Sequence, residues 1–168
     1  MATEKDLDLA LAAELEKSPE FLSWFVSHTK FAGSGVTFHS CRANHPWGTH
    51  PFRYTDETGT EAVVPRQSET DVLLLLKDKN GRIVGVHVEN KVGAGKFTHD
   101  QVEMYPQRAA HWVGNERYGC YEDFDIVLIA PEMFRERNTR QAAQFPAFIS
   151  HELIGQHIPL FATSAGVA

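Results

Sequence analysis

Two carboxylates that could bind a cation, Asp71 and Glu89, and one amine, Lys91, lie near the ends of two apolar segments of the sequence. Asn80-Gly81 stands between the segments, and Asn-Gly between aliphatic runs is typical of a β-hairpin. Residues two apart on a strand point to the same face, so Glu89 and Lys91 share a face. If Asp71 faces them from the other strand, two carboxylates and an amine meet at one place on a sheet.

The length of the hairpin loop decides whether Asp71 faces Glu89. A two-residue loop would pair Val72 with Glu89, whereas a three-residue loop, with Gly81 as the left-handed residue of a bulge, pairs Asp71 with Glu89. We favour the three-residue loop because it collects aliphatic side chains into one continuous face. That face consists of Val72, Leu74, Leu76, Val84, Val86 and Val88.

The predicted pairing of Asp71 with Glu89 is unfavourable unless a ligand compensates for it. Two like charges directly opposite each other on a sheet cost roughly 0.2–1 kcal/mol before any desolvation. A divalent cation between the two carboxylates would offset that repulsion. Oxygen ligands of this kind suit Mg²⁺ or Mn²⁺.

The order of these residues resembles that of a known group of enzymes. Asp71, followed by Glu89-Asn90-Lys91 on the next strand, resembles the PD-(D/E)XK nuclease superfamily, which has the restriction-endonuclease-like fold. Downstream, Gln101 and Tyr105 match the QxxxY motif of its RecB-like and phage-exonuclease-like branch. Thr70 stands where the family motif has proline, a departure that leaves the metal ligand in place.

The resemblance implies metal-dependent hydrolysis of phosphodiester bonds, with DNA as the expected substrate and RNA as the alternative. Asp71, Glu89 and the backbone carbonyl of Asn90 would hold one Mg²⁺ or Mn²⁺. Lys91 would orient or deprotonate the attacking water and offset charge in the transition state. The two QxxxY side chains would position the ligands or the scissile phosphate. Neither the choice between endonuclease and exonuclease nor a pathway, such as defence or DNA processing, follows from these motifs.

Residues 3–17 have the leucine spacing of an amphipathic helix, with Leu7, Leu11 and Leu15 on one stripe. Glu14 falls within this stripe, and a buried carboxylate needs a partner. Members of the resembled superfamily often carry a metal-binding acid on their first helix, so Glu14 is the candidate. The alternative is a glutamate at the edge of the helix whose carboxylate reaches water.

Residues 41–68 contain several prolines and glycines, which predicts a long loop or a ragged hairpin. Arginines alternate with aromatic residues there, a pattern that suits phosphate contact and base stacking. The alternative is that the aromatic residues cover the end of the sheet. Cys41, His45 and His50 do not have the spacing of a standard zinc site. The candidate nucleic-acid contacts, from this segment and from downstream, are Arg42, Trp47, Arg53, Lys96 and Arg108.

Thr98 is placed to cap a helix, with Gln101 three residues later as its capping-box partner. Pro106 lies inside that helix and is expected to kink or divide it. If the helix packs beside the hairpin, Gln101 and Tyr105 face the metal. The alternative is that Gln101 acts only as a cap.

We expect a single α/β domain over residues 1–168, with a restriction-endonuclease-like core and helices on both faces of a central mixed sheet. The resemblance covers about residues 4–130 and is closest over residues 69–112. Residues 132–158 have the pattern of short helices. The predicted strands are residues 36–40, 70–78, 82–91 and 125–130.

The composition, 42% hydrophobic and 23% charged, is that of a globular protein. The net charge of −6 weakens the case for a nucleic-acid partner, but residues 1–20 carry −4 of it. No apolar run approaches about 18 residues, so no membrane span is expected. Two cysteines, Cys41 and Cys120, predict free thiols in a cytoplasmic protein and exclude a four-cysteine iron–sulfur cluster.

A second class of function remains open from the sequence alone. A nuclease-like domain can serve as an inactive nucleic-acid-binding or assembly module, and a homo-oligomer or larger complex is compatible with these residues. The presence of both carboxylates and of Lys91 favours the enzyme, because a purely structural domain does not require them.

Overall fold

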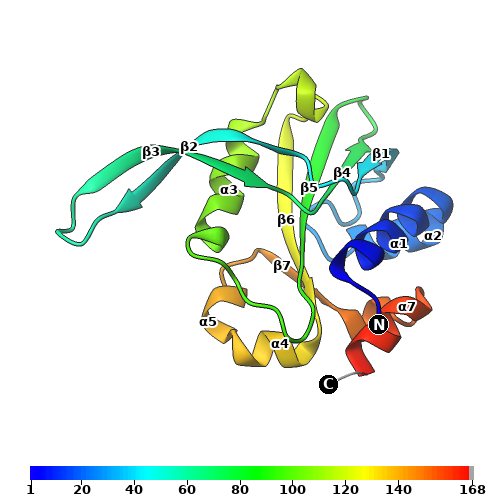
Figure 1. Ribbon diagram of the computed structural model, residues 1–168. Coiled ribbons are helices and arrows are strands. Elements are labelled where there is room, and N and C mark those ends of the chain that lie inside the picture. Colours follow the sequence, from blue (N-terminus) through cyan, green and yellow to red (C-terminus); the bar gives the residue numbers. More distant parts are fainter. Residues whose placement is uncertain (167–168) are drawn as a thin grey trace.

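The computed structural model describes residues 1–166, in which a five-stranded mixed sheet has the order β1-β4-β5-β6-β7 (Figure 1). The first three strands in this order are antiparallel neighbours, and the last three are parallel. The predicted α/β class with a central mixed sheet is therefore confirmed. The strands are β1 (Thr37–Arg42), β4 (Val72–Lys77), β5 (Ile83–Asn90), β6 (Asp123–Ala130) and β7 (Ala147–Ser150).

The β4–β5 hairpin has the three-residue loop. Gly81 has a φ of +81°, and the Asp78 N–H donates to the Arg82 carbonyl at 2.9 Å. Val72 is the partner of Val88. Asp71 comes just before Val72 and Glu89 just after Val88, so in this antiparallel pair they lie opposite each other. The predicted register is correct.

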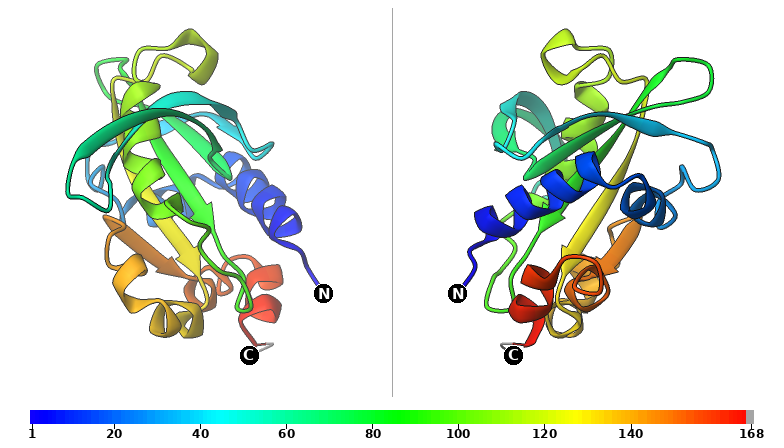
Figure 2. Two further views of the ribbon diagram at one scale, coloured as in Figure 1. Left: turned by 60° about the vertical axis from the view of Figure 1, so that its left-hand side comes forward. Right: turned by 90° about the vertical axis from the view of Figure 1, so that its right-hand side faces the viewer.

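Helices cover both faces of the sheet, as expected. The six aliphatic residues predicted on one face of the hairpin all belong to a core that the first helices cover. Figure 2 shows the first helix and α3 on opposite sides of the sheet. One side has α1 (Glu4–Lys17), α2 (Pro19–Val26), α6 (His151–Ile154) and α7 (Pro159–Gly166), and the other has α3 (Gln101–His111), the 3₁₀ helix η1 (Glu116–Tyr118), α4 (Glu132–Arg137) and α5 (Thr139–Ala142).

The segment expected to be a long loop or ragged hairpin is a regular antiparallel hairpin, β2 (Trp47–Thr55) and β3 (Glu61–Glu69). It forms a separate two-stranded sheet that projects from the rest of the chain (Figure 1). Gln107 on α3 fastens it, because its side-chain amide both accepts from and donates to the backbone of Arg53, at 2.7 and 2.9 Å. The base of this hairpin leads directly into Asp71.

Two expectations about the second half of the chain were wrong in part. Residues 147–150, predicted as helical, form the parallel edge strand β7. A strand of four residues is too short to show an alternating pattern. Helix α3 continues through Pro106 without division. No helix within residues 1–166 is both long enough and apolar enough to cross a bilayer.

Candidate active site

Asp71 and Glu89 form the centre of a cluster of polar side chains on the α3 side of the sheet. Glu89 is 1% exposed and the Asp71 side chain 13%. Burial and the adjacent Glu89 carboxylate together raise the pKa of Asp71 to about 9. The Asn90 N–H donates to Asp71 Oδ2 at 2.8 Å and fixes the orientation of the carboxyl group. The two carboxyl groups therefore lie next to each other, as expected from the sequence.

Three donors converge on the Glu89 carboxylate. Gln101 Nε2 donates to Oε1 at 2.6 Å, and the Tyr105 hydroxyl donates to Oε2. The Lys91 amine lies 3.0 Å from Oε1. Gln101 and Tyr105 reach the same carboxylate because residues four apart lie on one face of a helix. The structure thus brings together Asp71 and the four other residues that were predicted as catalytic.

Lys91 carries its charge at neutral pH in this environment. It is 8% exposed. Burial alone would lower its pKa, but the Glu89 carboxylate and the other nearby acids outweigh burial and raise it. The ammonium group is therefore a fixed positive charge beside the carboxyl groups of Glu89 and Asp71.

Gln101 has both of the roles that were considered for it. Its Oε1 accepts from the Thr98 N–H at 2.9 Å, which is the capping contact, while its Nε2 donates to Glu89. The helix itself begins at Gln101, two residues later than a capping box with Thr98 as the N-cap implies, since Asp100, with φ of +61°, occupies the N-cap position. Capping and site contact are not alternatives, because an amide can accept and donate at the same time.

His45 and Glu69 join the site from the base of the β2–β3 hairpin. His45 Nδ1 lies 3.3 Å from Glu69 Oε1 and 3.8 Å from Asp71 Oδ1. One ligand atom from each of the three residues lies within 4.8 Å of the others, so the three could hold a metal ion. The Thr70 N–H donates to the Pro46 carbonyl at 3.0 Å, which ties the His45 loop to the segment between Glu69 and Asp71.

Asp8 is the acid that α1 contributes to the site. It is fully buried. Its two oxygens meet His45 Nε2 at 3.0 Å and Asn90 Nδ2 at 2.8 Å. Burial raises the pKa of Asp8, although both hydrogen bonds oppose this. Burial lowers the pKa of His45, and the hydrogen bonds to Asp8 and Glu69 outweigh it and raise that pKa.

The structure corrects the prediction that Glu14 is the acid that the first helix contributes to the site. Glu14 is partly exposed, and among residues 1–166 its side chain makes no hydrogen bond or ion pair with the site. Asp8 and Glu14 lie about 60° to either side of Leu11 around the helix axis. Both therefore border the leucine stripe, and only the packing of α1 decides which border faces the site.

The donor set fits a divalent cation. With Nε2 of His45 donating to Asp8, Nδ1 faces the carboxyl groups of Glu69 and Asp71, and a proton on one of these groups or a bound cation makes that contact favourable. The hydrogen bonds to Asp8 and Glu69 raise the pKa of His45, and a bound metal would displace a proton from this place. One imidazole nitrogen with carboxylate oxygens favours Mn²⁺ over Mg²⁺. The residues that would hold it are His45, Glu69 and Asp71, with Glu89 beside Asp71.

The sequence prediction missed His45, Glu69 and Asp8. His45 was considered only as a partner of Cys41 in a zinc site, and that pairing does not occur: Cys41 is a free thiol on β1, and burial raises its pKa to about 12. The available signal was the spacing of Glu69 and Asp71, which places two acids on one side of an extended segment.

Arg108 is a buried structural residue, so its prediction as a nucleic-acid contact is corrected. It is 1% exposed and stacks on the Tyr105 ring at 4.0 Å. Its guanidinium donates to Thr70 Oγ1 at 3.0 Å and to Ser68 Oγ at 2.9 Å. Thr70 in turn bonds the buried His87 at 2.7 Å. These buried side chains thus form a hydrogen-bonded group that packs against Tyr105 of the site.

The other four predicted contacts are at least partly exposed and lie in separate places. Arg42 ends β1 and Trp47 begins β2, on the side of the site near the base of the projecting hairpin. Arg53 lies farther out on β2, and Lys96 is exposed in the connection between β5 and α3. Of these four residues, only Arg42 and Trp47 share a neighbour: Arg42 donates to the Arg117 carbonyl, and the Arg117 guanidinium lies over the Trp47 ring.

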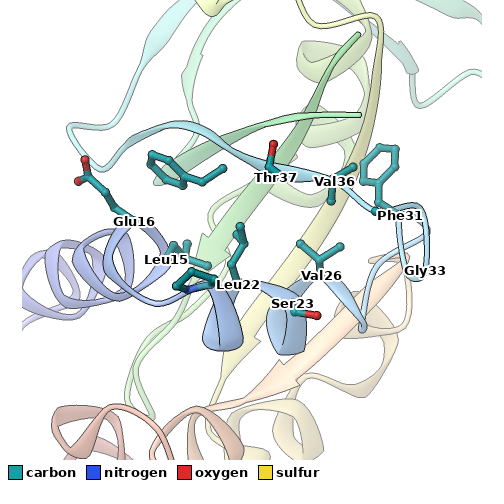
Figure 3. Close-up of a pocket in the computed structure, with 12 residues that line it drawn as sticks. Leu15, Glu16, Leu22, Ser23, Val26, Phe31, Gly33, Val36 and Thr37 are labelled. Atoms are coloured by element: carbon teal, nitrogen blue, oxygen red, sulfur yellow. The ribbon is translucent and has the colours of Figure 1, made fainter. Parts of the chain in front are cut away.

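A separate pocket of about 460 Å³ lies between α1, α2 and the start of β1 (Figure 3). Leu15, Leu22, Val26 and Phe31 contribute to its mainly apolar lining, and Glu16 is its charged member. It does not include any residue of the Asp71–Glu89 cluster. We assign no chemistry to it.

Comparisons of the chain with protein-family models, with curated proteins and with solved structures gave no significant match. The geometry of the site therefore carries the assignment of function.

Proposed function

We propose that this chain is a metal-dependent nuclease that hydrolyses phosphodiester bonds in DNA, with the residue pattern of the PD-(D/E)XK superfamily. The single observation that carries this proposal is the convergence of Asp71, Lys91, Gln101 and Tyr105 on Glu89. Stability does not account for such a cluster, because burying two adjacent carboxylates destabilises a fold.

Each residue would have a distinct part in the reaction. A bound Mn²⁺ or Mg²⁺ would lower the pKa of a water molecule and neutralise charge on the phosphate. The charged Lys91 would orient the water and offset the charge that develops on the phosphorane oxygens. Gln101 and Tyr105 hold Glu89 in one rotamer, so that its carboxylate needs no reorganisation. Asp8 holds His45 in the same manner.

The experiment is incubation of the protein with linear, circular and single-stranded DNA in Mn²⁺, with EDTA as the blank. Wild type should cleave at least one substrate, and Lys91→Ala should cleave it at least about a hundredfold more slowly. Lys77→Ala is the matched control, since Lys77 is exposed on β4 at the far end from the site. If wild type cleaves none of these substrates, nor an RNA strand, the chain is instead an inactive binding or assembly module.

A further inference from the structure

Trp47 presents a large aromatic surface to solvent directly beside the candidate active site. It is 49% exposed, whereas Trp112 is 1% exposed. Trp47 is the cross-strand partner of Glu69 at the base of the β2–β3 hairpin. Glu69 in turn contacts His45. Directly paired residues on a sheet have Cβ atoms about 4.5–5.5 Å apart, so the indole begins within one side-chain length of the candidate metal ligands.

Two arginines accompany this indole. The Arg117 guanidinium lies over the Trp47 ring, 5.2 Å from its centroid. Arg42 donates to the Arg117 carbonyl at 2.5 Å. Arg117 is exposed and Arg42 partly so, and within residues 1–166 neither side chain forms an ion pair. Their positive charge is therefore available to a ligand.

The position of Trp47 is fixed from below. The Tyr118 hydroxyl donates to the Trp47 carbonyl at 2.7 Å. Tyr118 stacks on the buried Trp112, with ring centroids 3.7 Å apart and planes within 7°. The backbone that carries the exposed indole is thus held by a buried aromatic stack. A rigid aromatic platform loses little conformational entropy when a second ring stacks on it.

We infer that Trp47, Arg117 and Arg42 form a subsite for an unpaired nucleotide next to the phosphate that the active site attacks; this rests on the proposed function. Base stacking on an aromatic face requires a base that is free of its partner strand. The chain carries a net charge of −6, and duplex binding relies on many phosphate contacts. One guanidinium over the indole, with a second bonded to the backbone of the same arginine, suits a single strand better than a duplex.

Binding is measured in EDTA, where cleavage does not interfere, by fluorescence anisotropy of a labelled oligothymidylate of about a dozen nucleotides. Wild type should bind it more tightly than a blunt duplex of equal length. Trp47→Ala and Arg117→Ala should each weaken binding about tenfold, and Trp47→Phe should retain most of it. Arg140→Ala is the control, because Arg140 is exposed on the distant α5.

An abasic strand of the same length separates stacking from charge. Wild type should bind this strand weakly. Trp47→Ala should lower the affinity for it little, whereas Arg117→Ala should lower that affinity further. With about two phosphate contacts, the logarithm of the association constant should fall against the logarithm of salt with a slope of roughly −1.4. A steep slope, or equal binding of strand and duplex, would contradict the inference.

The two proposals can fail separately. Binding through Trp47 without any cleavage in Mn²⁺ would support the strand subsite and remove the nuclease. Cleavage by wild type, with Trp47→Ala and Arg117→Ala unchanged in both strand binding and strand cleavage, would overturn the subsite and leave the nuclease in place.

Discussion

Asp8 on α1 lies 3.0 Å from Nε2 of His45, and this contact turns Nδ1 of the same ring toward Glu69 and Asp71. His45 has a φ of +51°, in the left-handed region that residues other than glycine seldom adopt. A buried acid that orients an imidazole toward carboxylates has the arrangement of a metal ligand and its supporting group. The first helix therefore acts on the site through His45.

Replacement of Asp8 by asparagine should weaken metal binding. An asparagine cannot accept from both His45 and Asn90 as the carboxylate does, so the imidazole loses its fixed orientation. We expect a ten- to hundredfold loss in Mn²⁺ affinity, measured by calorimetry. Glu14→Gln is the control on the same helix and should bind Mn²⁺ like wild type. Equal effects of the two substitutions would show that Asp8 has no special place in the site.

Tyr105→Phe should reduce turnover without unfolding the protein. The substitution removes only the hydroxyl that donates to Glu89 and leaves the ring under Arg108. We expect kcat to fall about ten- to hundredfold with little change in Tm. Gln101→Ala should lower kcat and also Tm, because it removes the contact to Thr98 as well. The control is Tyr54→Phe on the projecting hairpin. Normal turnover with a lowered Tm in Tyr105→Phe would assign Tyr105 to packing alone.

The stability of the metal-free protein should decrease as pH rises. The folded pKa of Asp71, about 9, lies above its ordinary value of 3.8. Folding thus takes up a proton between these values. The contribution of Asp71 is complete below about pH 4 and is lost as pH rises through 9. Asp71→Asn should match wild type near pH 4 and exceed it increasingly toward pH 9, in urea denaturation with EDTA. A difference that is constant with pH would contradict the shifted pKa.

Arg108→Met should destabilise the fold and leave nucleic-acid affinity unchanged. The substitution removes two hydrogen bonds from a buried charged group. We expect a loss of about 2–4 kcal/mol in the free energy of unfolding, measured with urea. Arg140→Ala should change neither quantity. A stable Arg108→Met protein with weaker DNA binding would restore the surface role that the sequence suggested.

The β4–β5 hairpin could be predicted because three local signals agreed there. The signals are the Asn-Gly turn, the alternating aliphatic residues and the three-residue loop that aligns them on one face. Together they placed Asp71 opposite Glu89, and the structure has that register. Gln101 and Tyr105 followed from the match to the QxxxY motif, and helical spacing put both on one face toward Glu89. These are contacts that depend on short segments of the chain.

Residues whose role depends on how distant elements pack could not be predicted in this way. Asp8 and Glu14 border the same leucine stripe, and only the docking of α1 distinguishes them. His45 reaches the site because the β2–β3 hairpin returns the chain beside Asp71, a tertiary pairing with no local pattern. Arg108 resembled a surface arginine because burial of a charged side chain has no signature in sequence.

The central claim is that Asp71 and Glu89 are kept together to bind a divalent cation. The most direct measurement is thermal unfolding of wild type and Asp71→Asn at pH 8, in EDTA and in Mn²⁺ at about a hundred times its Kd. Wild type should gain about 2.7 kcal/mol, or roughly 5–11 °C, from Mn²⁺. Asp71→Asn should gain far less, although in EDTA it should melt at or above wild type. An Asp71→Asn protein that is several kcal/mol less stable in EDTA, well beyond the roughly 1 kcal/mol of an ordinary substitution, would make Asp71 a structural residue and contradict the proposed active site.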